Sequence, residues 1–332
     1  MEKDRKRQNG QLNPNTANAL FHKRSSLPKF VKKIITMKNQ KLLIVFLLCA
    51  FAGTAQNVNY KIIKDQPDDI ANIWVNFELL QFELPIKNVS GTSFGLGLNS
   101  VFNYKNKLGG EATFRRSYLT LGDKPRLQFE LGGFYHLTSK TKTRNQKVVL
   151  DSKSYSSGGK TYTSTKFIHV PASLMKSFGV RAGFNYNREF FEADQEAHGF
   201  TGDYTYQFGG LYLGGLITSQ MNLMIDTDNF GKAGTGFVRR YYADLLFNPI
   251  RSLKDANTEV AYTANKPGML GWRVGVEFLP PEPRKVQGHA LYIKTEVGMR
   301  PLDGFFMMAS FGFSFKRKIS KFGTYTPVRE QE

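Results

Sequence analysis

Hydrophobic and polar residues alternate along most of the chain from about residue 70 onward. Between Phe305 and Phe315 every odd-numbered residue is apolar, and the positions between them include Ser310, Gly312 and Ser314. Side chains along a strand point alternately to its two faces, so this pattern predicts a strand with one apolar face. No stretch of the chain sustains a helical period.

Eleven segments show this alternation and are separated by turn-rich or charged stretches. They are residues 73–86, 94–105, 109–121, 126–138, 161–175, 178–188, 203–219, 237–249, 272–278, 291–300 and 305–316. A bacterial single-chain barrel has an even number of strands. Either one strand is missed, at 57–65 or 220–228, or two segments belong to one strand. We therefore predict an all-β fold, an antiparallel transmembrane β-barrel of about 10–12 strands.

Two local features refine this prediction. The alternation slips by one residue near Leu79–Leu80 and near Arg115–Arg116, and a β-bulge would explain each slip. The polar stretches Ser139–Lys160, Glu189–Asp203 and Ile250–Pro267 are predicted to be long loops. A soluble β-sandwich is the alternative fold, but strands of about ten residues behind an export signal favour a membrane barrel.

The export signal occupies residues 37–55. It has two lysines, an uncharged apolar core from Leu42 to Ala52 and a small-residue cleavage site ending at Ala55. The core is about half the length of a membrane-spanning helix, so cleavage that leaves Gln56 as the first mature residue is the preferred interpretation. The only cysteine, Cys49, would be lost with the signal, and Leu48 before it does not suit lipid attachment.

The remaining chain divides around this signal. Residues 1–36 are basic and are interpreted as an over-extended start, residues 56–317 as the barrel and residues 318–332 as a C-terminal tail. The formal net charge is +19; residues 1–36 hold nine basic and two acidic residues and the signal two lysines, which leaves +10. No nucleic-acid-binding motif accompanies this charge, so we expect no nucleic acid partner.

With its signal, strand series and aromatic- and glycine-rich strands, the chain resembles Gram-negative outer-membrane β-barrel proteins of the small to medium, porin-like class. The resemblance covers residues 56–317. It implies an outer-membrane location, contact with outer-membrane lipid and lipopolysaccharide, and insertion by the barrel-assembly machinery. In that family an aromatic residue ending the last strand is similar to the signal that this machinery reads. Phe315 takes that place, although this chain continues to Glu332.

The candidate functional residues are the charged residues that alternate with the apolar ones along the strands, and they are expected to face the lumen. They are Glu111, Arg115, Arg126, Glu130, Arg181, Arg273, Glu277, Lys294, Glu296 and Arg300. In a narrow barrel such charges fill the interior as a paired network. In a wider one they line a channel for ions or small polar solutes. The alternative function is a non-conducting, structural or docking barrel of an envelope complex, with residues 139–160 and 250–267 contacting an envelope protein partner.

A lipid hydrolase of the outer membrane is the remote enzymatic alternative. It needs a nucleophile and a base within hydrogen-bond reach on the lipid-facing side. His136, His169 and Ser310 fall on the inward parity, and only His289 shares the lipid parity. We therefore expect no catalytic centre and no cofactor.

Two acidic stretches are candidates for metal sites. The stretch Asp226–Asn229 departs from a calcium loop because Phe230 and Phe237 stand at ligand positions. The run from Glu189 to His198 has no spacing that defines ligand geometry. Both are predicted to be solvated loops, and no metal is expected.

Overall fold

The computed structural model describes residues 58–87, 91–120, 125–193, 201–261, 268–280, 290–301 and 304–318. The basic leader, the signal, the Ala55–Gln56 cleavage site and the tail beyond residue 318 lie outside these residues, so their assignments stay predictions. The described residues form eleven strands: β1 (Tyr60–Asp65), β2 (Ile73–Pro85), β3 (Ser93–Tyr104), β4 (Leu108–Thr120), β5 (Leu127–Ser157), β6 (Lys160–Ala193), β7 (Gly202–Thr227), β8 (Gly231–Asp255), β9 (Leu270–Leu279), β10 (Ala290–Arg300) and β11 (Gly304–Arg317).

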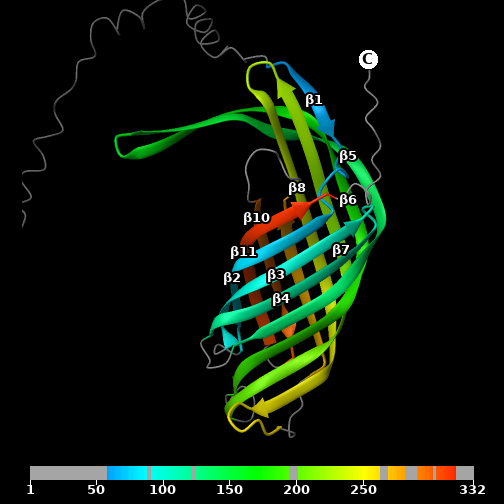
Figure 1. Cartoon of the computed structure of the whole chain (residues 1–332), viewed down its shortest axis with the longest axis vertical. Helices are drawn as coiled ribbons and strands as arrows, with labels where there is room; N and C mark the ends of the chain where they lie inside the picture. The colour runs from blue at the N-terminus through cyan, green and yellow to red at the C-terminus, as the bar shows by residue number, and fades with distance from the viewer. Residues whose placement is uncertain are drawn as a thin grey trace, which may run out of the picture. The chain divides into compact units, whose positions relative to one another are not determined.

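Strands β2 to β11 close into an antiparallel barrel of ten strands (Figure 1). The barrel is closed by antiparallel pairing of β2 with β11. This pairing extends from Ile73 opposite Arg317 to Pro85 opposite Phe306. The predicted fold class is therefore confirmed. The count is even because the predicted segments 161–175 and 178–188 are one strand, β6. No helix among the described residues is long and apolar enough to cross a membrane.

The two ends of the barrel can be named from this closure. The terminal end is where β2 begins and β11 finishes, and the opposite end is called the far end. The hairpins β3–β4, β5–β6 and β7–β8 turn at the terminal end, since each strand is antiparallel to its neighbours. Residues 250–255 of β8 lie at the far end, where they pair with the start of β7.

Several predicted loops are strands, and those predictions were wrong. Residues 139–160 belong to the long hairpin of β5 and β6, residues 189–193 to the end of β6, and residues 250–255 to β8. Residues 194–200 and 262–267 lie outside the described part. Residues 161–175 were predicted as a strand and belong to β6, but the first strand of the hairpin escaped prediction. It projects beyond the barrel, and near the tip both its faces are exposed and carry mainly Ser, Thr and Lys. Neither face of such a strand is apolar, so the sequence shows no alternation of apolar and polar residues there.

Both candidate missing strands are strands, although neither adds to the barrel. Residues 60–65 form β1, which pairs with β7 outside the ring of ten, and residues 220–227 continue β7. The predicted bulge at Leu79 is present, since the register with β11 steps from Leu80 to Glu78. The bulge expected at Arg115–Arg116 is wrong. Pairing with β5 is continuous there, and the irregularity falls at Tyr118 instead.

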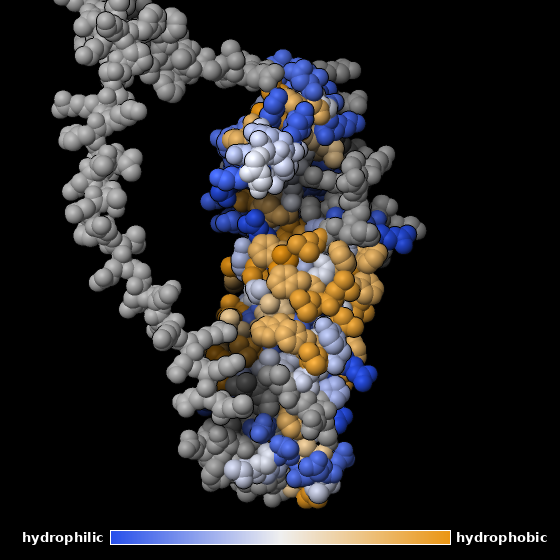
Figure 2. Space-filling model, turned by 90° about the vertical axis from the view of Figure 1, so that its left-hand side faces the viewer, coloured by the Kyte–Doolittle hydropathy of each residue, from blue (hydrophilic) through white to orange (hydrophobic). Residues whose placement is uncertain are grey.

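The outer face of the barrel carries a band of apolar side chains. On β11 it runs from Phe305 to Phe315, and other strands add residues such as Phe77 on β2, Leu213 on β7 and Leu245 on β8, which are each more than one third exposed. Figure 2 shows hydrophobic residues gathered across the middle of one side of the barrel, with more hydrophilic residues above and below. Ten steps along a tilted strand span roughly 25 Å, the height of the apolar band in outer-membrane barrels.

The β5–β6 hairpin beyond Thr138 and Phe178 is called the arm. One of its faces packs on the outer face of the β7–β8 hairpin through Val148, Val170, Leu174, Leu223 and Ile225, which are all buried. The arm parts from β7 after Met175, because the last β6–β7 pair at this end is Met175 with Gln220. An apolar second layer therefore holds the arm over β7 and β8.

Strand β1 fills the edge that this parting exposes. Asp65 pairs with Leu223 of β7, so β1 takes the place beside β7 that β6 has left. The Asp65 carboxylate also accepts hydrogen bonds from the backbone N–H (2.7 Å) and the hydroxyl (2.8 Å) of Ser173 on β6. A buried edge with unpaired N–H groups would be costly, and β1 removes that cost.

Close packing inside the barrel depends on glycine at Gly183. An added Cβ there would lie 2.5 Å from the Leu131 carbonyl oxygen and 2.6 Å from Cζ of Tyr212, whereas at Gly215 it would meet nothing within 4 Å. We predict that Gly183→Ala lowers the free energy of unfolding by about 1–3 kcal/mol through overpacking. Gly215→Ala is the matched control and should change it little. Urea unfolding in detergent measures both, and equal effects would contradict this packing.

Candidate functional site

The interior of the barrel holds seven basic and eight acidic side chains that are shielded from solvent. They are Arg115, Arg126, Arg181, Arg240, Arg273, Lys294 and Arg300, with Glu78, Glu83, Glu111, Glu130, Glu189, Asp244, Glu277 and Glu296. Each lies within 4.0 Å of an oppositely charged member of the set. All ten residues selected from the sequence belong to this group, which we call the ionic network.

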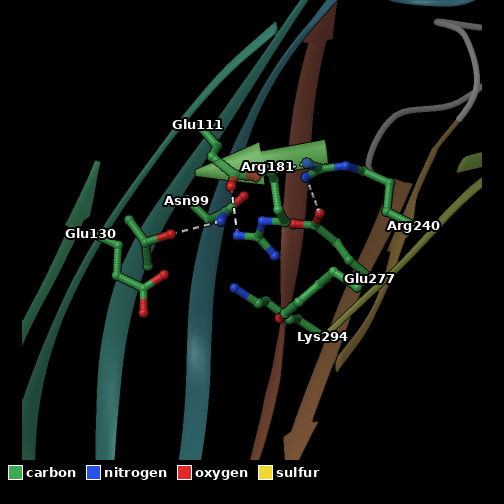
Figure 3. Close-up of a pocket in the computed structure, with 9 residues that line it drawn as sticks. Asn99, Glu111, Glu130, Arg181, Arg240, Glu277 and Lys294 are labelled. Carbon is green, nitrogen blue, oxygen red and sulfur yellow. Dashed lines mark hydrogen bonds and ion pairs between the residues drawn. The ribbon is translucent and has the colours of Figure 1, made fainter. Parts of the chain in front are cut away.

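The centre of the network joins β4, β6, β8 and β9. The Glu111 carboxylate accepts from Arg181 Nη2 at 2.5 Å through one oxygen and from Arg240 Nη2 at 2.7 Å through the other. Arg240 continues to Glu277 at 2.5 Å. Figure 3 shows these side chains converging from different strands. One carboxylate is thus shared by two guanidinium groups, and charge-assisted bonds of this kind are the strong ones.

Arg273 of β9 extends the centre across the lumen. It donates to Asp244 of β8 at 2.8 Å and to Glu130 of β5. Lys294 of β10 pairs with Glu296 of the same strand at 3.1 Å. Glu130 and Arg273 are 143 residues apart in sequence, so this contact ties together opposite parts of the barrel wall.

Arg115 and Glu78 form the most completely buried ion pair with two bonds. Arg115 donates through Nε at 2.5 Å and through Nη2 at 2.8 Å to the two oxygens of Glu78, and the exposed fraction of either side chain is at most 1%. The pair links β2 to β4 across the intervening β3. The parallel two-bond geometry matches a planar guanidinium to a carboxylate.

A separate group of charges closes the far end. Arg126 contacts Glu83 at 2.5 Å and Glu189 at 3.0 Å. Arg300 contacts the same two carboxylates and also lies 3.7 Å from the centre of the Phe306 ring. Two cations therefore face two anions, and no net charge is left in this layer.

The terminal end is closed by apolar residues instead. The segment between β1 and β2 brings Ile70 and Ala71 against Trp74, and the surrounding strands complete a buried cluster with Val101, Phe134, Leu216, Val238 and Leu279. Trp74 donates from its indole N–H to the Pro280 carbonyl at 2.8 Å. The segment's own backbone is bound too, because Asn222 donates to the Asp69 carbonyl at 2.5 Å.

Three tyrosines donate hydrogen bonds to carboxylates of the ionic network. Tyr212 donates to Glu111 at 3.0 Å, Tyr292 to Glu277 at 2.9 Å, and Tyr242 to Glu296. The space left between the central side chains is about 10 Å³, lined by residues that include Asn99 and Thr113. That volume holds about one water molecule. The central layer is therefore filled by side chains.

Five members of the ionic network were not selected from the sequence: Glu78, Glu83, Glu189, Arg240 and Asp244. Glu78 and Glu83 have opposite parity and face the same interior because the Leu79 bulge shifts the alternation between them. Glu189 was assigned to a solvated loop, whereas β6 carries it into the barrel. Arg240 and Asp244 share their parity with Tyr242, opposite the exposed Tyr241 and Leu245, and that signal could have found them.

The histidine positions can be given for the described residues. The His136 ring is buried, with Nε2 3.0 Å from the Thr218 hydroxyl and Nδ1 3.0 Å from the Asn106 carbonyl. Ser310 is buried on the inward face. His169 is exposed on the arm rather than in the barrel wall, and His289 lies outside the described residues.

The two acidic stretches can be placed in part. Thr227 accepts from the Phe230 N–H and donates to the Gly231 carbonyl, so residues 227–231 form a tight hairpin turn between β7 and β8. Of the run from Glu189 to His198, only Glu189–Ala193 is described, as the end of β6. No group of three or more metal-binding side chains occurs among the described residues.

The fold defines the class of this protein as a closed antiparallel β-barrel with a charge-filled interior. Comparison with protein-family models and with curated proteins found no match to the chain. Arguments about its function therefore rest on its own residues.

Arg115 and Arg116 give a direct test of the ionic network. Arg115 is buried against Glu78, and Arg116 next to it is exposed on the outer face. We predict that Arg115→Ala lowers the free energy of unfolding by about 3–5 kcal/mol, because Glu78 is left as a buried, unpaired charge. Arg116→Ala should cost less than about 0.5 kcal/mol.

Chemical unfolding of the folded barrel in detergent measures both effects. Arg115→Met alone should be destabilising for the same reason as Arg115→Ala. The double variant Arg115→Met with Glu78→Leu should recover much of that stability, since no charge is then left unpaired. A double variant as unstable as the two single losses combined would contradict the pairing argument.

Proposed function

We propose that this protein is an integral β-barrel of a Gram-negative outer membrane that conducts no solutes and serves as an anchored docking element of an envelope complex. The observation that carries the proposal is the filled interior, in which charged and apolar layers occupy successive levels of the lumen. The proposal contains no catalytic step.

The membrane location is supported by the apolar outer band. Large hydrophobic side chains stand more than one third exposed on the outer face of the barrel strands, for example Leu213 at 64% and Leu245 at 71%. Soluble monomers rarely expose contiguous apolar surface beyond a few hundred Å². Lipid is the solvent that suits this surface, and a closed barrel leaves no unpaired backbone within it.

The absence of conduction is supported by charge balance as well as by packing. Seven basic and eight acidic groups leave a formal charge of only −1 inside the barrel, and most lie within direct hydrogen-bond distance of an opposite charge. A selective pore presents charges of one sign to the passing solute. Here each charge is already engaged, so a permeating ion would have to replace an existing partner.

The docking role is assigned to the arm. Between Thr138 and Phe178 it carries eight lysine or arginine residues and one acidic residue, Asp151. The second predicted contact surface, residues 250–267, begins at the far end, whereas the arm is rooted at the terminal end. One partner on one side of a membrane cannot engage both, and the projecting arm offers the larger surface.

Single-channel recording tests the absence of conduction. The purified protein, refolded into planar lipid bilayers, should give no conductance steps, because a central layer with space for about one water cannot pass hydrated ions. Heat-modifiable gel migration confirms that the barrel is folded, and a general porin in the same bilayer is the positive control. Reproducible steps whose ion preference changes with Glu277→Gln would overturn the proposal and make the network a filter.

The membrane location has its own test at Phe311, in the middle of the apolar band and 42% exposed. Phe311→Arg should reduce the stability of the barrel in lipid bilayers by about 2–4 kcal/mol, the cost of arginine near the bilayer midplane. Thr163→Arg on the exposed arm is the control and should have no such effect. Equal stability of the two variants, or a chain that stays soluble without detergent, would contradict a lipid-facing band.

A further inference from the structure

A groove lies where the arm leaves the barrel, and it combines two kinds of lining. Its volume is about 560 Å³. Its lining includes Phe178, Ile217 and Leu174, which we call the apolar wall, and the cations Lys140, Lys142, Arg144 and Lys176, which we call the basic wall. The groove therefore presents apolar and strongly basic side chains next to one another.

The apolar wall continues the outer band of the barrel. Phe178 of β6 and Ile217 of β7 are direct cross-strand partners, and they are 50% and 46% exposed. Leu174 lies four residues further along β6 on the same face, beyond Lys176, and is buried in the apolar layer beneath the arm. An aliphatic chain lying on the band can thus run up to Phe178 and Ile217, where the cations begin, without leaving apolar contact.

The basic wall has an unfavourable arrangement in the absence of an anion. Lys140 and Lys176 are direct partners across the β5–β6 ladder, and like charges placed opposite each other destabilise a sheet. Lys142 and Arg144 follow on the same face. These four side chains are exposed and form no ion pair with any residue in the described part of the chain. An anion bound between them would relieve the repulsion.

We propose that this groove binds the phosphate group of an anionic membrane lipid, with an acyl chain of the same lipid lying on Phe178 and Ile217. This inference rests on the proposed membrane location. A free phosphate would use the four cations and leave the apolar wall bare, and a neutral lipid would use the wall and leave the cations unpaired. Only a molecule that joins an anion to an aliphatic chain complements both walls.

The geometry also places the two parts of such a lipid at suitable depths. Phosphates lie at the edge of the hydrocarbon layer, and the cations begin two residues beyond Phe178, where the apolar band ends. A bound lipid would then brace the root of the arm against the barrel.

Native mass spectrometry of the full protein in detergent tests the inference with phosphatidylglycerol as the probe and phosphatidylcholine as the neutral comparison. We expect phosphatidylglycerol to bind at least about tenfold more tightly. The double variant Lys140→Gln with Lys176→Gln should weaken its binding by about thirtyfold, since each lysine near an anionic surface contributes roughly fivefold. Lys153→Gln with Lys160→Gln, towards the tip of the same arm, is the matched control and should leave binding unchanged.

Two further measurements distinguish the possible ligands. Phe178→Ser should weaken the binding of phosphatidylglycerol. It should have no effect on competition by inorganic phosphate, because phosphate does not contact the apolar wall. Inorganic phosphate that displaces the lipid at equal concentration would show a simple anion site and overturn the inference. So would equal binding of phosphatidylglycerol to the groove variant and the wild type.

The failure of this inference can be told apart from failure of the proposed function. If the barrel folds in bilayers and Phe311→Arg destabilises it, but lipid binding shows no headgroup preference, only the groove assignment fails. If the chain stays soluble without detergent, the membrane location fails and the groove assignment fails with it.

Discussion

The neutralisation of buried charge is the constraint on which the rest of this structure depends. Fifteen ionisable side chains lie inside a ring of ten strands, where each isolated charge would cost several kcal/mol. The barrel meets this cost by placing each charge within reach of opposite ones from other strands, as Glu111 does between Arg181 and Arg240. Strand register is thereby fixed, because a shift of one residue would send these charges to the apolar outer face.

This internal pairing leaves the two ends of the barrel with different characters. The far end is closed by Arg126 and Arg300 with two carboxylates, and the terminal end by Ile70, Ala71 and the indole of Trp74. The apolar closure comes from the segment between β1 and β2, so the same stretch of chain plugs the mouth and supports the arm through Asp65. The arm and the lumen closure are thus built as one unit.

The fold was largely predictable because outward-facing apolar positions and interior polar positions alternate. The pattern from Phe305 to Phe315 identifies a strand directly, and ten residues of the ionic network follow from the same parity. Prediction failed where that alternation is interrupted or has no apolar side. The Leu79 bulge moved Glu78 and Glu83 onto one face, and the exposed tip of the arm carries mainly serine, threonine and lysine. Pairing partners could not be predicted either, since Glu130 and Arg273 meet only through closure of the barrel.

A filled interior moves any activity of this protein to its surfaces. The central side chains cannot rotate away singly, because each movement would strand a charge such as Glu78 in a site with almost no access to water. Conformational freedom is instead available where contacts are few, and the outer half of the arm is exposed on both faces. In the proposed function, the barrel is a rigid anchor. What it holds in place is the basic arm, at the boundary where an apolar band meets charged groups.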